Sequence, residues 1–410
     1  QSLRAQADKK VYPRYMQEVL KKQENLDIIE GMVEDLIVED NCVKGVILDN
    51  GQTIEGRMVI LTTGTYLKAE ILCGDQKHAS GPDQQKESKY LSEKLANLGM
   101  RIQRLKTGTP PRVEINSVDY SKTSLQPGTD ANLAFSYQTN EFIPIEEQTP
   151  CYLTYTNEKT HQIIRDNLHR SSMYSGIVKG IGPRYCPSIE TKIVTFAGRD
   201  HHQLFLEPEG HESNEYYLNG FSSSLPPEVQ LAALRTIPAF QNVRFFKPGY
   251  AIEYDFFDPT QLKPTMESLL IDGLYMAGQV NGTTGYEEAA CQGLMAGINA
   301  VRKLDHKEPL ILHRDEAYIG VMIDDLVTKG TKEPYRLLTS RAEYRLLLRH
   351  DNADARLSEY GYETGLISDE RYARYQKKMQ NIEEMISYLA SVRFTPKSTV
   401  NGLLERLGLD

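Results

Sequence analysis

The feature that most constrains this fold is a short apolar run at residues 273–277, followed by a glycine-rich loop and then by an alanine-rich stretch, residues 287–301, that favours a helix. The glycines of the loop are Gly278, Gly282 and Gly285. Glycine lets the backbone approach a ligand closely, and the free N–H groups at the start of a helix suit a phosphate or an anionic ring. The order strand, loop, helix therefore predicts an α/β protein, with either a ligand site or an ordinary tight turn at this loop.

A second strand with a polar end is predicted at residues 56–66. The run is apolar up to Leu61, and its carboxyl end carries Thr62, Thr63, Gly64 and Thr65. Ligands of open α/β sheets bind at the carboxyl ends of the strands. We therefore expect these four residues to form a second ligand-facing edge beside the glycine loop, although a strand that simply ends in a polar turn would leave the same pattern.

Length and composition bound the class of protein. The chain has 410 residues, of which 40% are hydrophobic and 25% are charged, and this predicts a water-soluble protein of two or three domains. No apolar run approaches the ~20 residues of a membrane span. The net charge of −9 does not favour nucleic-acid binding by the whole surface, so any such surface must be a local basic patch.

Cysteine and histidine usage argues against disulfides and metal. The five cysteines have wide, unmatched spacings and an odd count, which fits neither a disulfide framework nor a zinc cluster and indicates a reducing compartment. Three histidines lie near Glu207 and Glu209, but His201 and His202 are adjacent in a strand-like stretch and must point to opposite faces. We expect no metal site.

The order of the predicted elements indicates an inserted domain. An amphipathic helix at residues 7–24 precedes a three-stranded meander, and a further helix is predicted at residues 91–99. The three β-type runs of the meander are residues 26–30, 33–39 and 43–48. Residues 113–150 suggest long loops with short strands, and residues 249–265 are strand-like. The chain thus leaves one sheet near residue 88, builds a separate body and returns at about residue 265.

Two further segments carry clustered cations. Four of them bracket a Gly-Thr-Pro-Pro turn at residues 108–111, and they suit either an anionic partner or a solvated edge strand: Arg101, Arg104, Lys106 and Arg112. A helix is predicted over residues 339–349, where Arg341, Arg345 and Arg349 would share one face. Such a stripe suits the phosphates of a nucleic acid, or it is an exposed face paired with Glu343 and Asp351. A long charged helix follows, with Ser368 as its N-cap.

Cys186 is the candidate nucleophile. It lies in a loop opened by Gly180 and Gly182, with Arg184 and Lys192 close in sequence. Nearby cations lower the pKa of a thiol and favour the nucleophilic thiolate. A lone cysteine is also commonly an inert small hydrophobic residue, and the two interpretations are about evenly balanced here.

Four motifs together resemble the MnmG (GidA) family of FAD-dependent tRNA uridine 5-carboxymethylaminomethyl modification enzymes. They are residues 105–112, 182–190, 278–290 and 330–349, in the order of the family. The resemblance covers essentially the whole chain.

The resemblance implies an α/β fold with a glutathione-reductase-like, Rossmann-type FAD-binding domain, an inserted α+β domain and the start of a C-terminal helical domain. The implied boundaries are 1–88 and 265–305 for the FAD domain, 89–264 for the insertion, 306–365 for a connecting segment with the basic helix, and 366–410 for the helical domain. The family's N-terminal G-x-G-x-x-G loop has no match here, so we expect the chain to be truncated at both ends.

The resemblance also implies site residues. Val33, Ser88 and Gln279 match FAD contacts of the family, and Cys186 matches an essential cysteine. With the residues identified above, the expected cofactor set is Val33, Thr63, Gly64, Ser88, Gly278, Gln279, Gly282, Thr283 and Gly285. Residues 182–196 match a proposed NADH-binding stretch, in which we expect Gly182, Pro183, Arg184, Tyr185 and Lys192 to take part. The residues expected to bind tRNA or another anion are Lys106, Arg112, Arg341, Arg345 and Arg349.

The implied activity is modification of C5 of the wobble uridine in tRNA, with FAD, NADH as reductant and methylenetetrahydrofolate as carbon donor. C5 of uracil is a poor nucleophile until a group adds at C6, and a thiolate at Cys186 would serve there. The implied partners are tRNA and the GTPase MnmE, in a heterotetramer built on a homodimer. The implied location is the bacterial cytoplasm, and a mitochondrial homologue also fits.

Two alternatives remain. The related folate- and FAD-dependent tRNA uridine-5-methyltransferase shares the flavin architecture but lacks a segment matching residues 330–354. A non-catalytic fragment that binds tRNA or a partner is the other. Flavin absorbance that survives desalting would favour an enzyme over such a fragment.

Overall fold

The computed structural model describes residues 4–185, 187–393 and 398–408. It forms two compact units, one of residues 1–309 and 325–336 and the other of residues 310–324 and 337–410. Among the described residues, no helix combines the length and the apolar character that crossing a membrane requires. The first unit contains all of the sheets.

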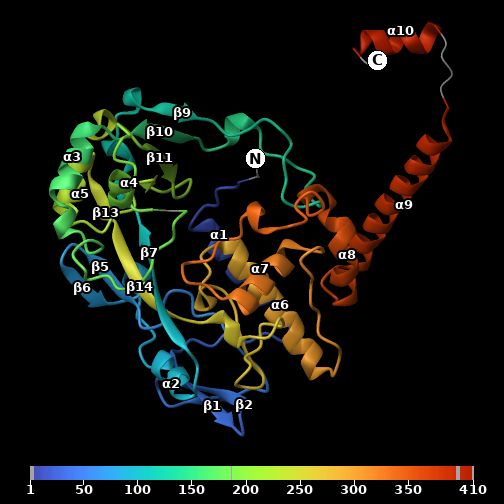
Figure 1. Ribbon diagram of the computed structural model, residues 1–410, viewed down its shortest axis with the longest axis horizontal. Helices are drawn as coiled ribbons and strands as arrows, with labels where there is room; N and C mark the ends of the chain where they lie inside the picture. The colour runs from blue at the N-terminus through green and yellow to red at the C-terminus, as the bar shows by residue number, and fades with distance from the viewer. Residues whose placement is uncertain (1–3, 186, 394–397, 409–410) are drawn as a thin grey trace. The chain divides into compact units, whose positions relative to one another are not determined.

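The largest sheet of the first unit has six antiparallel strands in the order β13-β8-β12-β11-β10-β9. Its strands are β8 (Arg112–Glu114), β9 (Ser124–Gln126), β10 (Cys151–Tyr155), β11 (Gln203–Pro208), β12 (Glu215–Asn219) and β13 (Phe245–Lys247). Helices α3 (Glu158–Asp166), α4 (Ile189–Thr195) and α5 (Pro227–Leu234) lie beside it (Figure 1). The short strands and long loops expected over residues 113–150 are confirmed.

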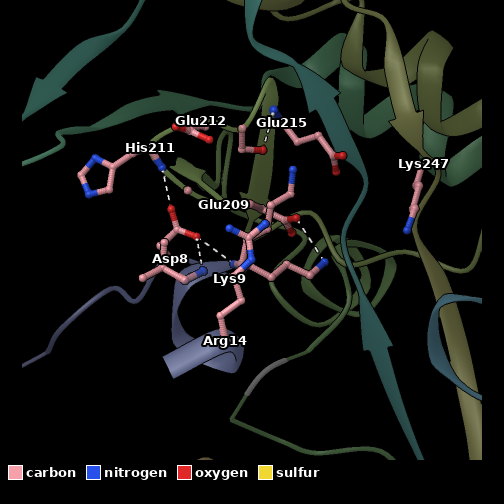
Figure 2. A pocket seen from close by; sticks show the side chains of 12 residues that line it. Asp8, Lys9, Arg14, Glu209, His211, Glu212, Glu215 and Lys247 are labelled. Atoms are coloured by element: carbon pink, nitrogen blue, oxygen red, sulfur yellow. Dashed lines mark hydrogen bonds and ion pairs between the residues drawn. The ribbon is translucent and has the colours of Figure 1, made fainter. Parts of the chain in front are cut away.

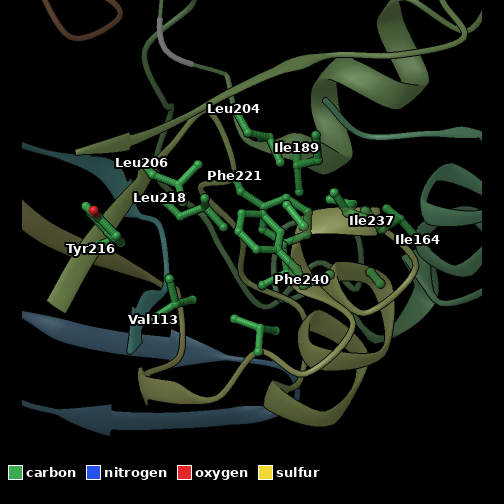
Figure 3. Close-up of a cluster of buried hydrophobic side chains, with 14 of the residues drawn as sticks. Val113, Ile164, Ile189, Leu204, Leu206, Tyr216, Leu218, Phe221, Ile237 and Phe240 are labelled. Carbon is green, nitrogen blue, oxygen red and sulfur yellow. The ribbon is translucent and has the colours of Figure 1, made fainter. Parts of the chain in front are cut away.

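The core of this body is one apolar cluster (Figure 3). Leu204 and Leu206 alternate along β11 and point inward, as the two-residue period of a strand requires. They meet Phe221 and Phe240, which are fully buried. Ile164 of α3 and Ile189 of α4 contribute from the helices, so that sheet and helices share a single hydrophobic core.

A four-stranded antiparallel sheet connects this body to the rest of the unit. Its order is β6-β5-β14-β7, and the strands are β5 (Glu70–Cys73), β6 (Gln76–Ala79), β7 (Ile102–Thr109) and β14 (Tyr250–Phe257). β7 leads out to the six-stranded sheet, and β14 returns beside it over eight residue pairs (Figure 1). The sheet combines strands from both sides of residue 88.

The third sheet carries the predicted strand–loop–helix order. β4 (Val59–Leu61) and β15 (Leu274–Met276) pair in parallel, with Ile60 opposite Tyr275. After β15 comes the glycine loop with a short 3₁₀ turn, η8 (Gln279–Asn281), and then helix α6 (Tyr286–Leu304). This confirms the expected strand, loop and helix.

The three-stranded meander is also present, but one of its strands was misassigned. It consists of β1 (Val33–Glu39), β2 (Cys42–Leu48) and β3 (Thr53–Glu55). Residues 26–30 are not a strand: Ile28 and Ile29 stay exposed, and β3 takes the second edge of β2 after a turn at Gly51. Helices α1 (Val11–Lys22) and α2 (Leu91–Asn97) are present as predicted, and α2 packs against β1.

The second unit is helical. It contains α8 (Ala353–Glu363), α9 (Asp369–Ser391) and α10 (Ser398–Arg406), and α7 (Tyr318–Lys329) spans the division between the units. Ser368 Oγ accepts a hydrogen bond from the N–H of Arg371 at 3.3 Å, which confirms the predicted N-cap of α9.

The helix predicted over residues 339–349 is wrong. The segment consists of a 3₁₀ turn, η9 (Thr339–Arg341), followed by further turns. Ala342 and Leu348 are both buried against Val321. Residues six apart lie about 120° apart around a straight helix, so a helix could not bury both against one neighbour. The chain therefore folds into turns, and the three arginines do not form the expected stripe.

Candidate functional site

The loops after β4 and β15 meet at one edge of the parallel pair. The N–H of Ala277 donates to the carbonyl of Leu61 at 2.9 Å, which carries the pairing to the ends of the strands. Beyond it, Gly64 lies beside Gln279, since a Cβ built on Gly64 would be 3.8 Å from Gln279 Oε1. Gly64, Gly278 and Gly282 all have positive φ, a conformation that favours glycine. The two predicted ligand-facing loops are therefore neighbours.

Ser88 lies next to the same edge. Its N–H donates to the carbonyl of Tyr66, and its carbonyl accepts from the N–H of Lys68, both at 2.9 Å. Val33 begins β1, whose partner strand ends near Asp49. Lys86 Nζ lies 3.0 Å from the Asp49 carboxylate. The chain before Ser88 is thus tied to the end of the meander that carries Val33.

Three buried hydroxyls at this edge lack hydrogen-bond partners among the described residues. They are Thr63 Oγ1, Ser88 Oγ and Thr284 Oγ1. A buried polar atom without a partner costs about 1–3 kcal/mol, and such groups are rare enough to require an explanation. Each comes from a different segment, and the polar groups of a ligand bound at this edge are candidate partners for them.

The glycine loop is held rigidly by groups that sequence reasoning missed. Buried Gln292 of α6 accepts from the N–H of Gly278 at 3.1 Å and donates to Thr283 Oγ1 at 3.0 Å. On the other side, the N–H of Tyr335 donates to the carbonyl of Gly282 at 2.8 Å. A glutamine on the inward face of an alanine-rich helix was the available signal, because a buried amide requires partners.

The stretch expected to bind NADH reaches the glycine loop. The residues just before it are anchored by the buried carboxylate of Glu253, which accepts from the N–H groups of Lys179 and Gly180. Near its start, the hydroxyl of Tyr185 lies 3.5 Å from the carbonyl of Thr284. Gly182 and Pro183 lie between these anchors.

The other residues expected in this stretch have separate surroundings. Lys192 sits on α4 and donates to the carbonyl of Gly220 at 2.9 Å. Arg184 pairs with Glu333 at 2.6 Å. Cys186 lies outside the described residues.

Lys106 lies beneath this stretch. The N–H of Lys106 donates to the carbonyl of Ile181, and its side chain fills the space where a Cβ at Gly182 would lie. Burial lowers the pKa of Lys106 to about 8, although the nearby carboxylates of Glu190 and Glu253 act in the opposite direction. A lysine whose pKa is strongly lowered by desolvation is a frequent feature of functional sites.

The other predicted cations are paired within the protein. Arg112 is nearly buried, with its side chain 13% exposed, and it lies 2.9 Å from Glu209 and over the ring of Tyr217. Arg101 pairs with Asp258 and Arg104 with Asp255. The four cations around residues 108–111 therefore do not form one exposed surface.

The arginines of residues 341–349 have separate surroundings. The carbonyl of Arg341 accepts from Arg314, and Arg345 is exposed. Arg349 pairs with Asp351 at 2.9 Å, and Glu343 pairs with Arg314 at 2.8 Å.

A hollow of about 310 Å³ lies between the N-terminal segment and the hairpin of β11 and β12 (Figure 2). Several of its charged groups bond within the protein. Asp8 caps α1 through the N–H groups of Lys10 and Val11 and accepts from the N–H of His211, and Lys9 lies 3.2 Å from Glu209. None of the predicted site residues lines this hollow. In the described part of the chain, no cluster of three or more His, Cys, Asp or Glu side chains is arranged to hold a metal ion.

Comparisons with known proteins bear on this arrangement. The family model described as "Glucose inhibited division protein A" matches residues 1–308. The chain is 56% identical over 407 residues to the tRNA uridine 5-carboxymethylaminomethyl modification enzyme MnmG of Listeria innocua, and 57% identical to that of Bacillus subtilis. Each alignment covers 99% of this chain and 64% of the relative. The chain therefore spans slightly less than two thirds of the length of these relatives.

Solved structures agree with the sequence comparison. The form I crystal structure of Aquifex aeolicus GidA superposes with a TM-score of 0.91 at 47% identity, covering 99% of this chain and 70% of that one. The form II structure gives a TM-score of 0.89. The predicted α/β fold class is confirmed, and with a family model that matches well over half of its residues, the chain belongs to the GidA family, glucose inhibited division protein A.

Proposed function

We propose that this chain is part of a FAD-dependent enzyme that modifies C5 of the wobble uridine of tRNA. The observation that carries the proposal is the meeting of three loops, at Gly64, Ser88 and Gln279, around buried hydroxyls that lack partners. The relatives with which the chain shares 56–57% identity are named as tRNA uridine modification enzymes.

The residues at this edge fit a flavin. At Gly64 an added Cβ would meet no atom closer than 3.7 Å, which leaves room for a ring or its ribityl chain, and the hydroxyls of Thr63, Ser88 and Thr284 can bond its polar edges. The N-terminus of α6 follows Gly285 and favours an electron-rich ring edge. When bound, FAD would supply the hydride and one-carbon chemistry. Gln279, Thr283 and Val33 would complete its surroundings.

The remaining roles follow the same arrangement. The stretch from Gly182 to Tyr185 would present NADH to the flavin, because its end reaches Thr284. The thiolate of Cys186 would add to C6 of uracil and so make C5 nucleophilic. Methylenetetrahydrofolate would provide the carbon.

We further propose tRNA and the GTPase MnmE as partners, in a heterotetramer built on a homodimer in the cytoplasm. Arg345 and its neighbours would contact tRNA phosphates, and the exposed apolar residues of α9 suit a protein partner. These residues are Ile382, Met385, Ile386 and Leu389.

The test begins with the spectrum of the desalted protein, which we expect to show flavin bands. Nucleosides of tRNA from cells that rely on this protein are then measured by mass spectrometry. Cys186→Ser should abolish the C5 modification, whereas Cys151→Ser, on β10 of the six-stranded sheet, should not. A colourless protein, or full modification by Cys186→Ser, would contradict the proposal.

A further inference from the structure

Tyr185, Thr284 and Arg336 come from three distant segments and meet at the end of the glycine loop. Arg336 Nη1 donates to the carbonyl of Thr284 at 3.1 Å, and its guanidinium carbon lies 5.4 Å from the centre of the Tyr185 ring. The Tyr185 hydroxyl lies 3.5 Å from the same carbonyl. The carbonyl of Thr284 is thus close to both the Tyr185 hydroxyl and the Arg336 guanidinium.

The guanidinium of Arg336 is held in place. Its Nε lies 3.8 Å from the carboxylate of Glu288, which is buried in the first turn of α6. A side chain at Gly285 would collide with that carboxylate, so the missing Cβ is required for this arrangement. An arginine fixed at both Nη1 and Nε presents a planar surface with little further loss of freedom.

The Tyr185 ring remains partly open. It is 38% exposed, even with Arg336 beside it. Two polar atoms near it have no hydrogen-bond partner among the described residues: Thr284 Oγ1 and the hydroxyl of Tyr254, which lies in the interior of β14. An open aromatic surface beside unsatisfied polar atoms is what a planar heterocycle with a polar edge requires.

We propose that Tyr185 and Arg336 form a stacking wall for the planar base of a nucleotide ligand, with the Thr284 hydroxyl available to its polar edge. Unpaired bases stack on aromatic rings and on arginine planes in proteins that bind single-stranded nucleic acids. The base is either the target uracil of tRNA or the nicotinamide of NADH. This inference rests on the proposed function and adds Arg336 to its site.

The experiment uses the full flavin-loaded protein with two probes. Reduction of the flavin at increasing NADH concentration measures how well the nicotinamide is bound. The affinity for an anticodon stem-loop with uridine at the wobble position measures how well the uracil is bound. The variants are Tyr185→Leu, Tyr185→Phe, Arg336→Met and Arg336→Lys. Tyr155→Leu is the control, because Tyr155 is also 38% exposed but lies on β10.

We expect Tyr185→Leu and Arg336→Met to weaken the binding of one of the two probes about tenfold, since a stacked base contributes about 1–3 kcal/mol. Tyr185→Phe keeps the ring and should retain most of the affinity. Arg336→Lys keeps the charge but loses the plane, and should behave like Arg336→Met. Thermal unfolding of each variant separates loss of binding from loss of fold.

Unchanged affinity of Tyr185→Leu for both probes, or a loss in Tyr185→Phe equal to that in Tyr185→Leu, would overturn the stacking wall while leaving the proposed function intact. A wild-type protein that is neither reduced by NADH nor bound by the stem-loop would overturn both.

Discussion

The core of the six-stranded body and the edge formed by the glycine loops differ in the kind of group that they bury. In the core, Phe221 and Phe240 are fully buried among other apolar side chains (Figure 3). At the edge, Thr63, Ser88 and Thr284 bury hydroxyls that have no partner in the described chain. The first arrangement lowers the free energy of the folded state, whereas the second leaves polar groups without a partner in the described part of the protein. Substitutions in the two regions should therefore separate stability from binding.

The largest effect is expected in the core. Phe221→Ala should lower the free energy of unfolding by about 3–5 kcal/mol, because it removes a fully buried ring and leaves a cavity. Urea unfolding followed by circular dichroism measures the change. Phe246→Ala is the control, since that ring is 49% exposed on β13. If the two variants lost similar stability, the apolar cluster would not be the core of this body.

A substitution on β7, beneath the stretch that leads to the glycine loop, should raise stability instead. Lys106→Met removes a buried ammonium whose pKa is lowered from 10.5 to about 8. At pH values below about 8 the folded protein must keep this group charged, so the variant should be more stable by up to about 3 kcal/mol, at ~1.4 kcal/mol per pKa unit. The stabilisation should accompany a loss of function, since Lys106 lies beneath the stretch that leads to Tyr185.

The pH dependence gives the sign of this effect. Between pH values of about 8 and 10.5 the unfolded chain holds the Lys106 proton and the folded chain does not, so the stability of the wild type rises with pH in that window. The advantage of Lys106→Met should therefore shrink as the pH rises from about 8 to about 10. Lys94→Met, at an exposed ion pair with Asp35, should leave stability nearly unchanged. An advantage that persists undiminished at high pH would contradict the burial of a charge.

The same contrast explains what could be predicted from the sequence. Apolar periodicity depends on local spacing, and it identified α6, β14 and the meander. Apolar periodicity failed at residues 339–349, where Ala342 and Leu348 pack against one neighbour. It also failed at residues 26–30, because β3 pairs with the second edge of β2 instead of this segment.

The polar groups of the site were predicted unevenly. Gly64 and Gly278 follow strands, so their place at one edge could be inferred from the parallel pairing. Gln292 and Arg336 act through partners that are distant along the chain. No local pattern specifies such partners, and only the folded chain brings them together.

Alanine substitution should cost different amounts of stability at two glycines whose backbone conformations are similar. Gly51 and Gly282 have φ of 81° and 78°, so alanine at either position meets a similar backbone cost. At Gly51 the added Cβ meets open space, but at Gly282 it would lie 2.9 Å from the ring of Phe256 and 2.6 Å from Thr331 Cγ2. Gly282→Ala should therefore cost about 1–2 kcal/mol more than Gly51→Ala in thermal unfolding, because overpacking adds to the backbone term. Equal losses of stability in the two variants would mean that the glycine loop can move to accommodate the added methyl group.

The smallest effect is the sharpest test of the comparison. Thr284→Val removes a buried hydroxyl that has no partner in the described chain, so the free energy of unfolding should stay the same or rise by about 1 kcal/mol. Thr160→Val is the matched control: its hydroxyl lies 2.6 Å from that of Thr236 and accepts from the N–H of Asn157, so its loss should cost about 1 kcal/mol. Flavin retained after desalting should fall in Thr284→Val and stay unchanged in Thr160→Val. If Thr284→Val instead lost stability and kept its flavin, the hydroxyl would serve the fold, and the edge would not differ in kind from the core.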